Sequence, residues 1–119
     1  FIFQALNNRP LTIFGNGQQT RSFCFVYELV DGLIKMMDSK EIGPINLGNP
    51  KEFTIEELAR IIIKKVNPNL EIIYKSSLAD DPLNRQPSIE LAKNKLDWEP
   101  YISLNNGLDQ TIKWFRNNL

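Results

Sequence analysis

Three residues near the start of the chain have the spacing of a phosphate-binding loop. Gly15, Gly17 and Thr20 lie in the stretch LTIFGNGQQTRSF, where Thr20 stands at the third glycine of the pattern G-x-G-x-x-G. That pattern works because its glycines let a strand-to-helix turn approach a pyrophosphate, which then rests on the helix N-terminus. The next residues, TRSFCFV, alternate polar and apolar side chains, which is typical of a strand. Because the helix and the third glycine are both missing, the stretch does not predict a dinucleotide site.

The Asn16-Gly17 pair predicts a hairpin turn instead. Both residues tolerate the positive φ angles that a type I′ turn requires, and they lie between two strand-like runs. We therefore expect a β-hairpin here, with a strand on each side of the turn.

Two arginines in polar stretches could bind an anion. Arg21 comes just after the expected turn, and Arg85 lies in DDPLNRQPS. A guanidinium offers a planar fork of donors to phosphate oxygens, but a loop arginine is more often solvated or ion-paired, so composition alone assigns neither. We assign no catalysis to the adjacent carboxylates Asp80 and Asp81, because such loop pairs are usually solvated or capping groups.

Hydrophobic periodicity predicts the elements that must position these side chains. A T-x-x-E capping box, Thr54 with Glu57, should open one helix, and Trp98 and Trp114 should pack the last two helices together. The segment 1–6 is typical of the last turns of a helix, and about four further helices are expected at 26–37, 55–66, 88–96 and 104–119. Besides the hairpin, strands are expected at 43–50 and 70–76. Helices and strands alternate, so we expect an α/β fold.

Composition bounds the class of protein. The 119 residues suffice for one small domain with a single core, and 14 Lys and Arg balance 14 Asp and Glu, so nothing favours nucleic acid or an anionic membrane surface. With no histidine and Cys24 alone, the chain lacks a triad base, a zinc ligand set and an intramolecular disulfide. We expect a cytoplasmic protein without membrane contact from this segment. The abrupt start FIFQAL suggests the tail of a longer protein, whose earlier region leaves a membrane anchor open.

Several stretches in one order resemble a known family. These are PLTIFGNGQQTRSFCFVYELVDGL, PINLGNP, FTIEELA, DDPLNRQPSIELAKNKLDWEP and LNNGLDQTIKWF. Together they resemble the C-terminal part of the UDP-glucuronate decarboxylases (UDP-xylose synthases), within the extended short-chain dehydrogenase/reductase family of nucleotide-sugar enzymes, also called NAD-dependent epimerases/dehydratases. One departure is Phe25-Val26-Tyr27-Glu28, where the family usually has Tyr-Val-x-Asp.

The resemblance implies a division of labour along the complete protein. Residues 1–119 would form the C-terminal nucleotide-sugar-binding portion of a Rossmann-type enzyme. An N-terminal Rossmann half, absent from this chain, would bind NAD and carry a Tyr-x-x-x-Lys pair. No Tyr-x-x-x-Lys occurs here, so the resemblance assigns this chain no catalytic residue, no cofactor-binding residue and no metal ligand.

The resemblance also implies a substrate site. Gly17 would make a turn, and Arg21 and Arg85 would hold a diphosphate from two sides, as two forked cations can do without a metal. The segment that meets the uracil ring would consist of Thr12, Ile13, Phe14 and Gly15. In the reaction of the family, bound NAD⁺ takes hydride from C4 of UDP-glucuronate, the 4-keto intermediate loses carbon dioxide, and the NADH returns hydride to give UDP-xylose. The expected partner is a UDP-sugar, and the complete enzyme is expected to be a homodimer.

Two other functions stay open. A UDP-sugar 4-epimerase or a 4,6-dehydratase of the same superfamily would bind the nucleotide in a similar way. A non-catalytic α/β module would instead bind a partner through an apolar face, fold cooperatively alone and ignore UDP-sugars.

Overall fold

The helices form where the hydrophobic periodicity predicts them. The computed structural model describes all 119 residues. Its helices are α1 (Ile2–Leu6), α2 (Val26–Asp38), α3 (Ile55–Val66), α4 (Glu90–Leu96) and α5 (Leu104–Asn118). The hydroxyl of Thr54 accepts a hydrogen bond of 3.0 Å from the amide of Glu57, so the expected capping box does open α3. The α/β class is confirmed, with five helices and short strands.

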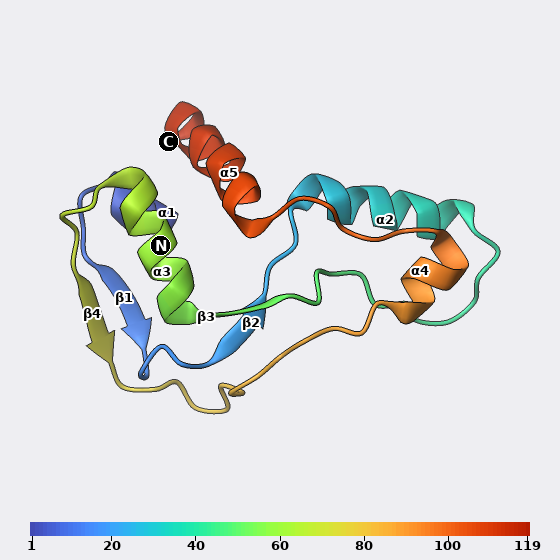
Figure 1. Ribbon diagram of the computed structural model, residues 1–119, viewed down its shortest axis with the longest axis horizontal. Helices are drawn as coiled ribbons and strands as arrows, with labels where there is room; N and C mark the ends of the chain where they lie inside the picture. Colours follow the sequence, from blue (N-terminus) through green and yellow to red (C-terminus); the bar gives the residue numbers. More distant parts are fainter.

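The four strands form two separate pairs. β1 (Leu11–Phe14) lies parallel to β4 (Ile72–Lys75), and β2 (Thr20–Ser22) lies antiparallel to β3 (Glu52–Thr54). Figure 1 shows β1 and β4 side by side at one end of the molecule, with β2 and β3 near its middle.

The predicted hairpin is wrong, because β1 and β2 do not pair. A type I′ turn needs positive φ at two consecutive residues. Here the positive φ angles fall on Gly15 (92°) and Gly17 (79°), with Asn16 between them outside that region. The chain therefore does not fold back along β1 after the turn, and β2 pairs with β3 instead. With β1 in the parallel pair with β4, the side chains of Leu11 and Ile13 are fully buried against α1, α3 and α5, and this burial outweighs the local turn preference.

Two further expectations about strands differ from the structure. Residues 43–50 form no strand, although Gly48 and Pro50 lie beside Pro87 and Gln86; Ile45 and Leu47 pack against buried apolar residues instead. The three-residue strand β3 was not expected, since it directly precedes the capping box.

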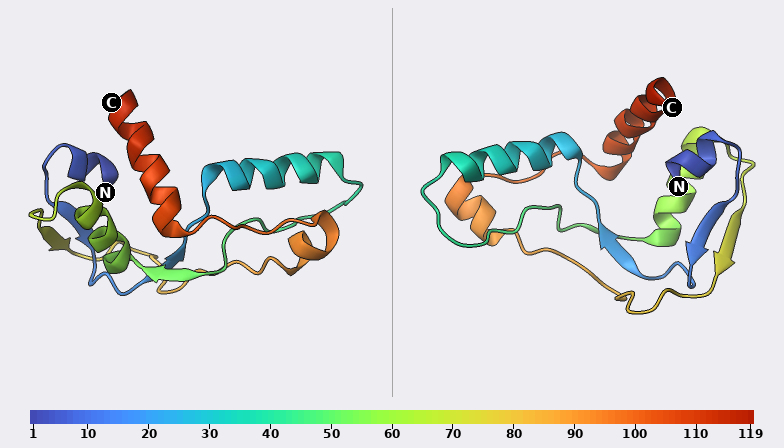
Figure 2. Two further views of the ribbon diagram at one scale, coloured as in Figure 1. Left: turned by 45° about the horizontal axis from the view of Figure 1, so that its top comes forward. Right: turned by 180° about the vertical axis from the view of Figure 1, so that it is seen from behind.

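The chain has two apolar cores instead of the single one expected. The first joins α1, α3, α5 and β1, and its buried residues are Ala5, Leu11, Ile13, Ala59, Ile62, Leu108 and Ile112. The second lies at the other end of the molecule, where Ile89, Ala92, Leu96 and Trp98 are buried. Figure 2 shows α2 and α4 apart from α1 and α3 in both views. Trp98 belongs to the second core, whereas Trp114 is 57% exposed, so the two tryptophans do not pack the last helices together.

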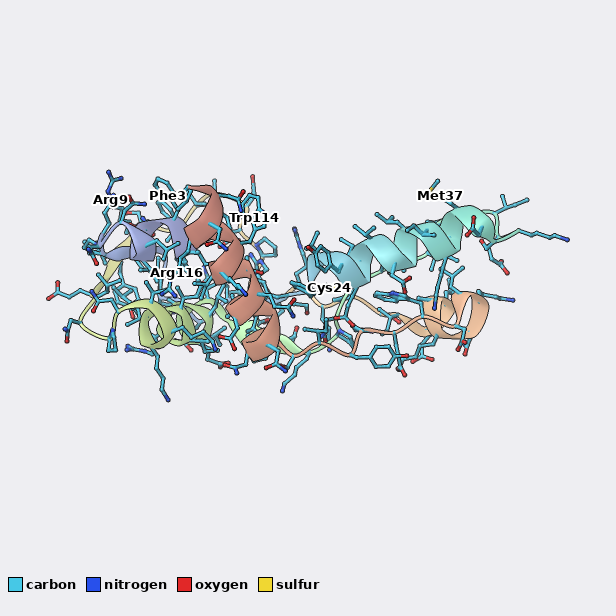
Figure 3. The ribbon with its side chains drawn as sticks, turned by 90° about the horizontal axis from the view of Figure 1, so that it is seen from above. Phe3, Arg9, Cys24, Met37, Trp114 and Arg116 are labelled. Carbon is cyan, nitrogen blue, oxygen red and sulfur yellow. The ribbon has the colours of Figure 1, made fainter.

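One face of α2 is apolar and uncovered. Its side chains are 44 to 82% exposed and recur at helical spacing: Val26, Val30, Leu33, Ile34 and Met37. Figure 3 shows Met37 at the far end of α2, and Cys24 where the chain passes between the two ends of the molecule. The radius of gyration is 16.3 Å, against about 13.5 Å for a compact chain of this length. The molecule is therefore elongated. None of its helices combines the length and apolar character that crossing a membrane requires.

Candidate nucleotide site

The first four expected site residues occupy β1 and the turn after it. The side chain of Ile13 is fully buried, so only its main chain can meet a ligand. Phe14 is 40% exposed, and Thr12 is half-buried. The amide of Gly15 donates to the carbonyl of Lys75 at 2.7 Å, which ends the pairing with β4.

One edge of β1 faces away from β4. The amides of Leu11 and Gly15 donate to β4 or the residue before it. Because main-chain groups alternate along a strand, those of Thr12 and Phe14 lie on the opposite edge. There the amide of Thr12 donates to Gln4 Oε1 at 3.2 Å, and the carbonyl of Phe14 accepts from Gln19 Nε2 at 3.0 Å. This edge offers main-chain donors and acceptors of the kind that a pyrimidine ring can pair with.

This edge lines an open pocket of about 580 Å³. Thr12, Ile13, Phe14 and Arg21 all line it, together with Gln4, Gln19, Lys75 and Asp81. A second pocket of about 620 Å³ shares Phe14, Gln19, Lys75 and Asp81 with the first and reaches Gly15. The two pockets together thus bring five of the six expected residues to one place.

Arg21 lies in β2 and not in a loop, opposite Phe53 of β3. Its Nη1 donates to the carbonyls of Thr20 at 2.6 Å and Pro82 at 2.8 Å, and its Nη2 forms an ion pair with Asp81. The side chain is 19% exposed. Arg21 is therefore a fixed, half-buried cation at the rim of the pocket, which distinguishes it from a solvated surface arginine.

Arg85 is exposed and lines neither pocket. Its neighbours are anchored on both sides. Asn84 Oδ1 accepts from the hydroxyl of Thr20 at 2.8 Å, and Gln86 Nε2 donates to the carbonyl of Pro50 at 2.8 Å. The main chain at Arg85 is thus held close to β2 while its guanidinium extends into solvent.

Sequence reasoning missed two polar residues of the pocket. Gln19 is 9% exposed, and its side chain reaches both Phe14 and Asp81. Asp81 is the ion-pair partner of Arg21. The carboxylates Asp80 and Asp81 looked equivalent in the sequence, because the contact of Asp81 spans 60 positions and leaves no local pattern.

Tyr74 lines the second pocket and forms a hydrogen bond to a charged residue. Its hydroxyl donates to Glu56, whose Oε1 lies 3.6 Å from Nη2 of Arg60. The hydrogen bond to Glu56 raises the pKa of Tyr74, because it stabilises the protonated phenol. This contact therefore disfavours the phenolate form of Tyr74.

The turn after β1 does not fit NAD. The amide of Gly15 is bonded within the sheet, and a Cβ at Gly17 would come within 3.1 Å of Glu56 Cβ, so no open cradle faces a pyrophosphate. No helix begins at the turn, since α2 starts only at Val26. This turn therefore supplies no pyrophosphate site for that cofactor.

Comparisons with known proteins show what the chain is similar to. Residues 1–48 match the model of the NAD dependent epimerase/dehydratase family. UDP-glucuronic acid decarboxylase 2 of Arabidopsis thaliana is 48% identical over 116 residues, which are 98% of this chain and 26% of the relative. Over residues 1–48, then, the chain is similar to the NAD dependent epimerase/dehydratase family. It spans about a quarter of that curated relative and corresponds to its C-terminal part.

Solved structures of two epimerases share the fold. An epimerase of Methanothermobacter thermautotrophicus superposes with a TM-score of 0.93 at 34% identity, over 98% of this chain and 36% of its own. The UDP-glucuronic acid 4-epimerase of Bacillus cereus, solved in complex with UDP-glucuronic acid and NAD, gives a TM-score of 0.91 at 27% identity, over 99% of this chain and 38% of its own.

Proposed function

We propose that residues 1–119 are the nucleotide-sugar-binding portion of a UDP-glucuronate decarboxylase, and that the complete protein converts UDP-glucuronate to UDP-xylose and carbon dioxide. One pocket carries this proposal. It is lined both by the edge of β1 that faces away from β4 and by the fixed cation of Arg21. The identity of 48% with an Arabidopsis UDP-glucuronic acid decarboxylase supports the choice of reaction.

In this proposal the uracil ring lies against β1. The carbonyl of Thr12 and the amide of Phe14, which Gln4 and Gln19 do not engage, would pair with its polar edge, and the exposed ring of Phe14 would cover one face. Fixed main-chain donors and acceptors discriminate well among bases, because a wrong pairing leaves buried polar groups without partners. The buried side chain of Ile13 supports this by holding β1 rigidly in the first core.

The diphosphate would lie between the two arginines. Arg21 is already oriented by protein contacts. Arg85 is held only through its neighbours, so its free guanidinium can close on the ligand from the other side. Charge-assisted, forked hydrogen bonds from two guanidinium groups can neutralise a diphosphate without a metal ion.

The contribution of this chain to the reaction is binding and orientation. Holding the nucleotide fixes the sugar at its far end, which lowers the entropic cost of reaching the reactive geometry. NAD, which would supply the oxidation and reduction at C4, would bind to a preceding half of the complete protein, because the turn at Gly15 and Gly17 does not fit it. The uncovered apolar face of α2 suits a chain that packs against further protein.

A UDP-sugar 4-epimerase is the second candidate. The TM-score of 0.91 with the UDP-glucuronic acid 4-epimerase of Bacillus cereus favours it, since both activities require the same nucleotide site. The products distinguish them: release of carbon dioxide from UDP-glucuronate supports the decarboxylase, and interconversion at C4 with retention of the carboxylate supports the epimerase. We further propose a homodimeric enzyme located in the cytoplasm, the latter because its single cysteine, Cys24, is unpaired.

Titration of UDP into the complete protein, followed by calorimetry, tests the site. Arg21→Ala and Arg85→Ala should each raise the Kd of UDP about ten- to a hundredfold, since hydrogen bonds to charged groups contribute about 1.5–3 kcal/mol. Arg9→Ala removes an equal charge from the region of α1, away from the pocket, and should leave the Kd unchanged. Unaltered UDP affinity in both site variants would refute the assignment of the diphosphate.

A further inference from the structure

A chain of side-chain contacts connects the two ends of the proposed nucleotide site. Nε2 of Gln19 donates to the carbonyl of Phe14 at 3.0 Å and to Oδ2 of Asp81 at 3.4 Å. The other oxygen of Asp81 accepts from Nη2 of Arg21. Gln19 is the one buried polar side chain of the molecule, at 9% exposure. A buried amide whose two N–H groups both find acceptors is a strong specifier of local structure.

The contacts of Arg21 leave it able to bind an anion. A guanidinium carries five N–H donors. Protein acceptors engage three of them, namely the carbonyls of Thr20 and Pro82 and the carboxylate of Asp81. Two donors therefore remain for a ligand while the side chain is already immobilised. Ordering a free arginine costs side-chain entropy, so fixing it before binding favours affinity.

We propose that Asp81, anchored by Gln19, is a positioning residue of the nucleotide site: it holds the guanidinium of Arg21 in the orientation that the diphosphate requires. This inference rests on the proposed function. It assigns a role to Asp81 in binding and none in proton transfer. Through Gln19, the position of Arg21 is also fixed relative to the carbonyl of Phe14, so the diphosphate and base ends of the site keep a constant separation.

The alternative is that Asp81 competes with the ligand. A carboxylate beside a diphosphate repels it, and an ion pair that must break would weaken binding. The contacts favour positioning, because both oxygens of Asp81 are engaged and Arg21 has donors to spare, so the ion pair can persist when the ligand binds.

The test compares two neighbouring carboxylates. Asp81→Asn removes the charge that faces Arg21. Asp80→Asn makes the same change one position earlier, in a residue that forms no ion pair, and its φ of 61° suits asparagine equally well. Binding of UDP and of uridine to the complete protein is followed by calorimetric titration for both variants, and for Arg21→Ala and the double variant Arg21→Ala with Asp81→Asn.

We expect Asp81→Asn to raise the Kd of UDP roughly three- to tenfold and to leave the Kd of uridine, which lacks the diphosphate, unchanged. Asp80→Asn should bind both ligands as the wild type does. In the Arg21→Ala background, Asp81→Asn should have no further effect, because it acts through Arg21. A merely structural role would weaken uridine as much as UDP.

Three results would overturn the inference. Unchanged or tighter UDP binding by Asp81→Asn would exclude a positioning role. Tighter binding would also establish that Asp81 competes with the ligand. Equal loss of uridine binding would show a structural role. A complete wild-type protein that does not bind UDP would overturn the proposed function itself, whereas the first two results leave UDP binding by the wild type intact.

Discussion

The indole of Trp98 donates from Nε1 to the main-chain carbonyl of Glu28 at a distance of 3.0 Å. This bond fastens the segment after α4 to the first turn of α2. The same ring lies beside Gly32, where an added Cβ would come within 3.0 Å of its Cε2. Trp98 therefore holds the second core together, although that core has only four buried residues.

Trp98→Ala should lower the free energy of unfolding by about 3–5 kcal/mol, the usual cost of removing a buried aromatic side chain. Urea denaturation followed by circular dichroism measures this loss. Trp114→Ala is the matched control, because Trp114 is 57% exposed and should cost about 1 kcal/mol or less. Trp98→Phe keeps most of the ring and should lose about 1 kcal/mol with the hydrogen bond. Similar losses for both alanine variants would contradict this account of the second core.

Glu28 should stabilise the fold through its carboxylate. Its Oε1 accepts from the amide of Ile102 at 3.0 Å, and its Oε2 accepts from the amide of Tyr101. Glu28→Ala leaves both amides without this partner and should cost about 2 kcal/mol in the free energy of unfolding. Glu41→Ala, an exposed carboxylate without an ion pair, should change it by about 0.5 kcal/mol or less. If both variants unfold at the same urea concentration, the contacts of Glu28 contribute nothing.

Cys24 should react slowly with alkylating agents. Desolvation raises the pKa of its thiol, and the negative charge of Glu28 raises it further. Because the thiolate is the nucleophile, the curve of iodoacetamide rate against pH should lie at higher pH for the native chain than for the chain in urea. Glu28→Gln should move the native curve part of the way back.

The same shift has a consequence for stability. The folded pKa of Cys24 lies above its unfolded value, so this contribution to stability is complete below the unfolded pKa and decreases as pH rises through the folded pKa. A native reactivity curve at or below the pH of the unfolded one would show that the environment of Cys24 does not disfavour the thiolate.

The 119-residue chain by itself should not decarboxylate UDP-glucuronate. It contains no Tyr-x-x-x-Lys sequence, and its glycine turn offers no cradle for NAD. Radiolabelled carbon dioxide released from UDP-glucuronate in the presence of NAD provides the assay. The complete protein is the positive control. Turnover by the purified chain would mean that its own residues carry out chemistry that we have not assigned to them.

Local sequence signals predicted the helices because a helix depends on neighbouring residues. The apolar spacing of α2 and the Thr54–Glu57 cap of α3 both act within a few positions. The Asn16-Gly17 signal is equally local, yet it failed, because the buried side chains of β1 gain more from β4 than from an adjacent hairpin strand. A local pattern predicts which turns a segment can form, whereas the burial of its side chains decides which strand it pairs with.

The site could be predicted only in part for the same reason. The resemblance to a family directed attention to Thr12, Phe14 and Arg21, which line one pocket. Neither Gln19 nor Asp81 stood out. No short-range sequence pattern distinguishes a buried amide in a polar stretch or one of two adjacent aspartates. Their roles depend on contacts across 62 and 60 positions.

The parallel pairing of β1 with β4 also delays completion of this sheet during synthesis of the chain. Leu11 is paired with Ile72, roughly sixty positions later. At a synthesis rate of about 5–20 residues per second, β4 leaves the ribosome roughly 3–12 s after β1. During that interval Leu11 and Ile13, which are fully buried in the finished fold, lack the strand that completes their sheet. The unpaired edge of β1 is then available to chaperones or to other nascent chains. The rate at which the ribosome synthesises the segment between β1 and β4 therefore influences how much of the protein folds correctly.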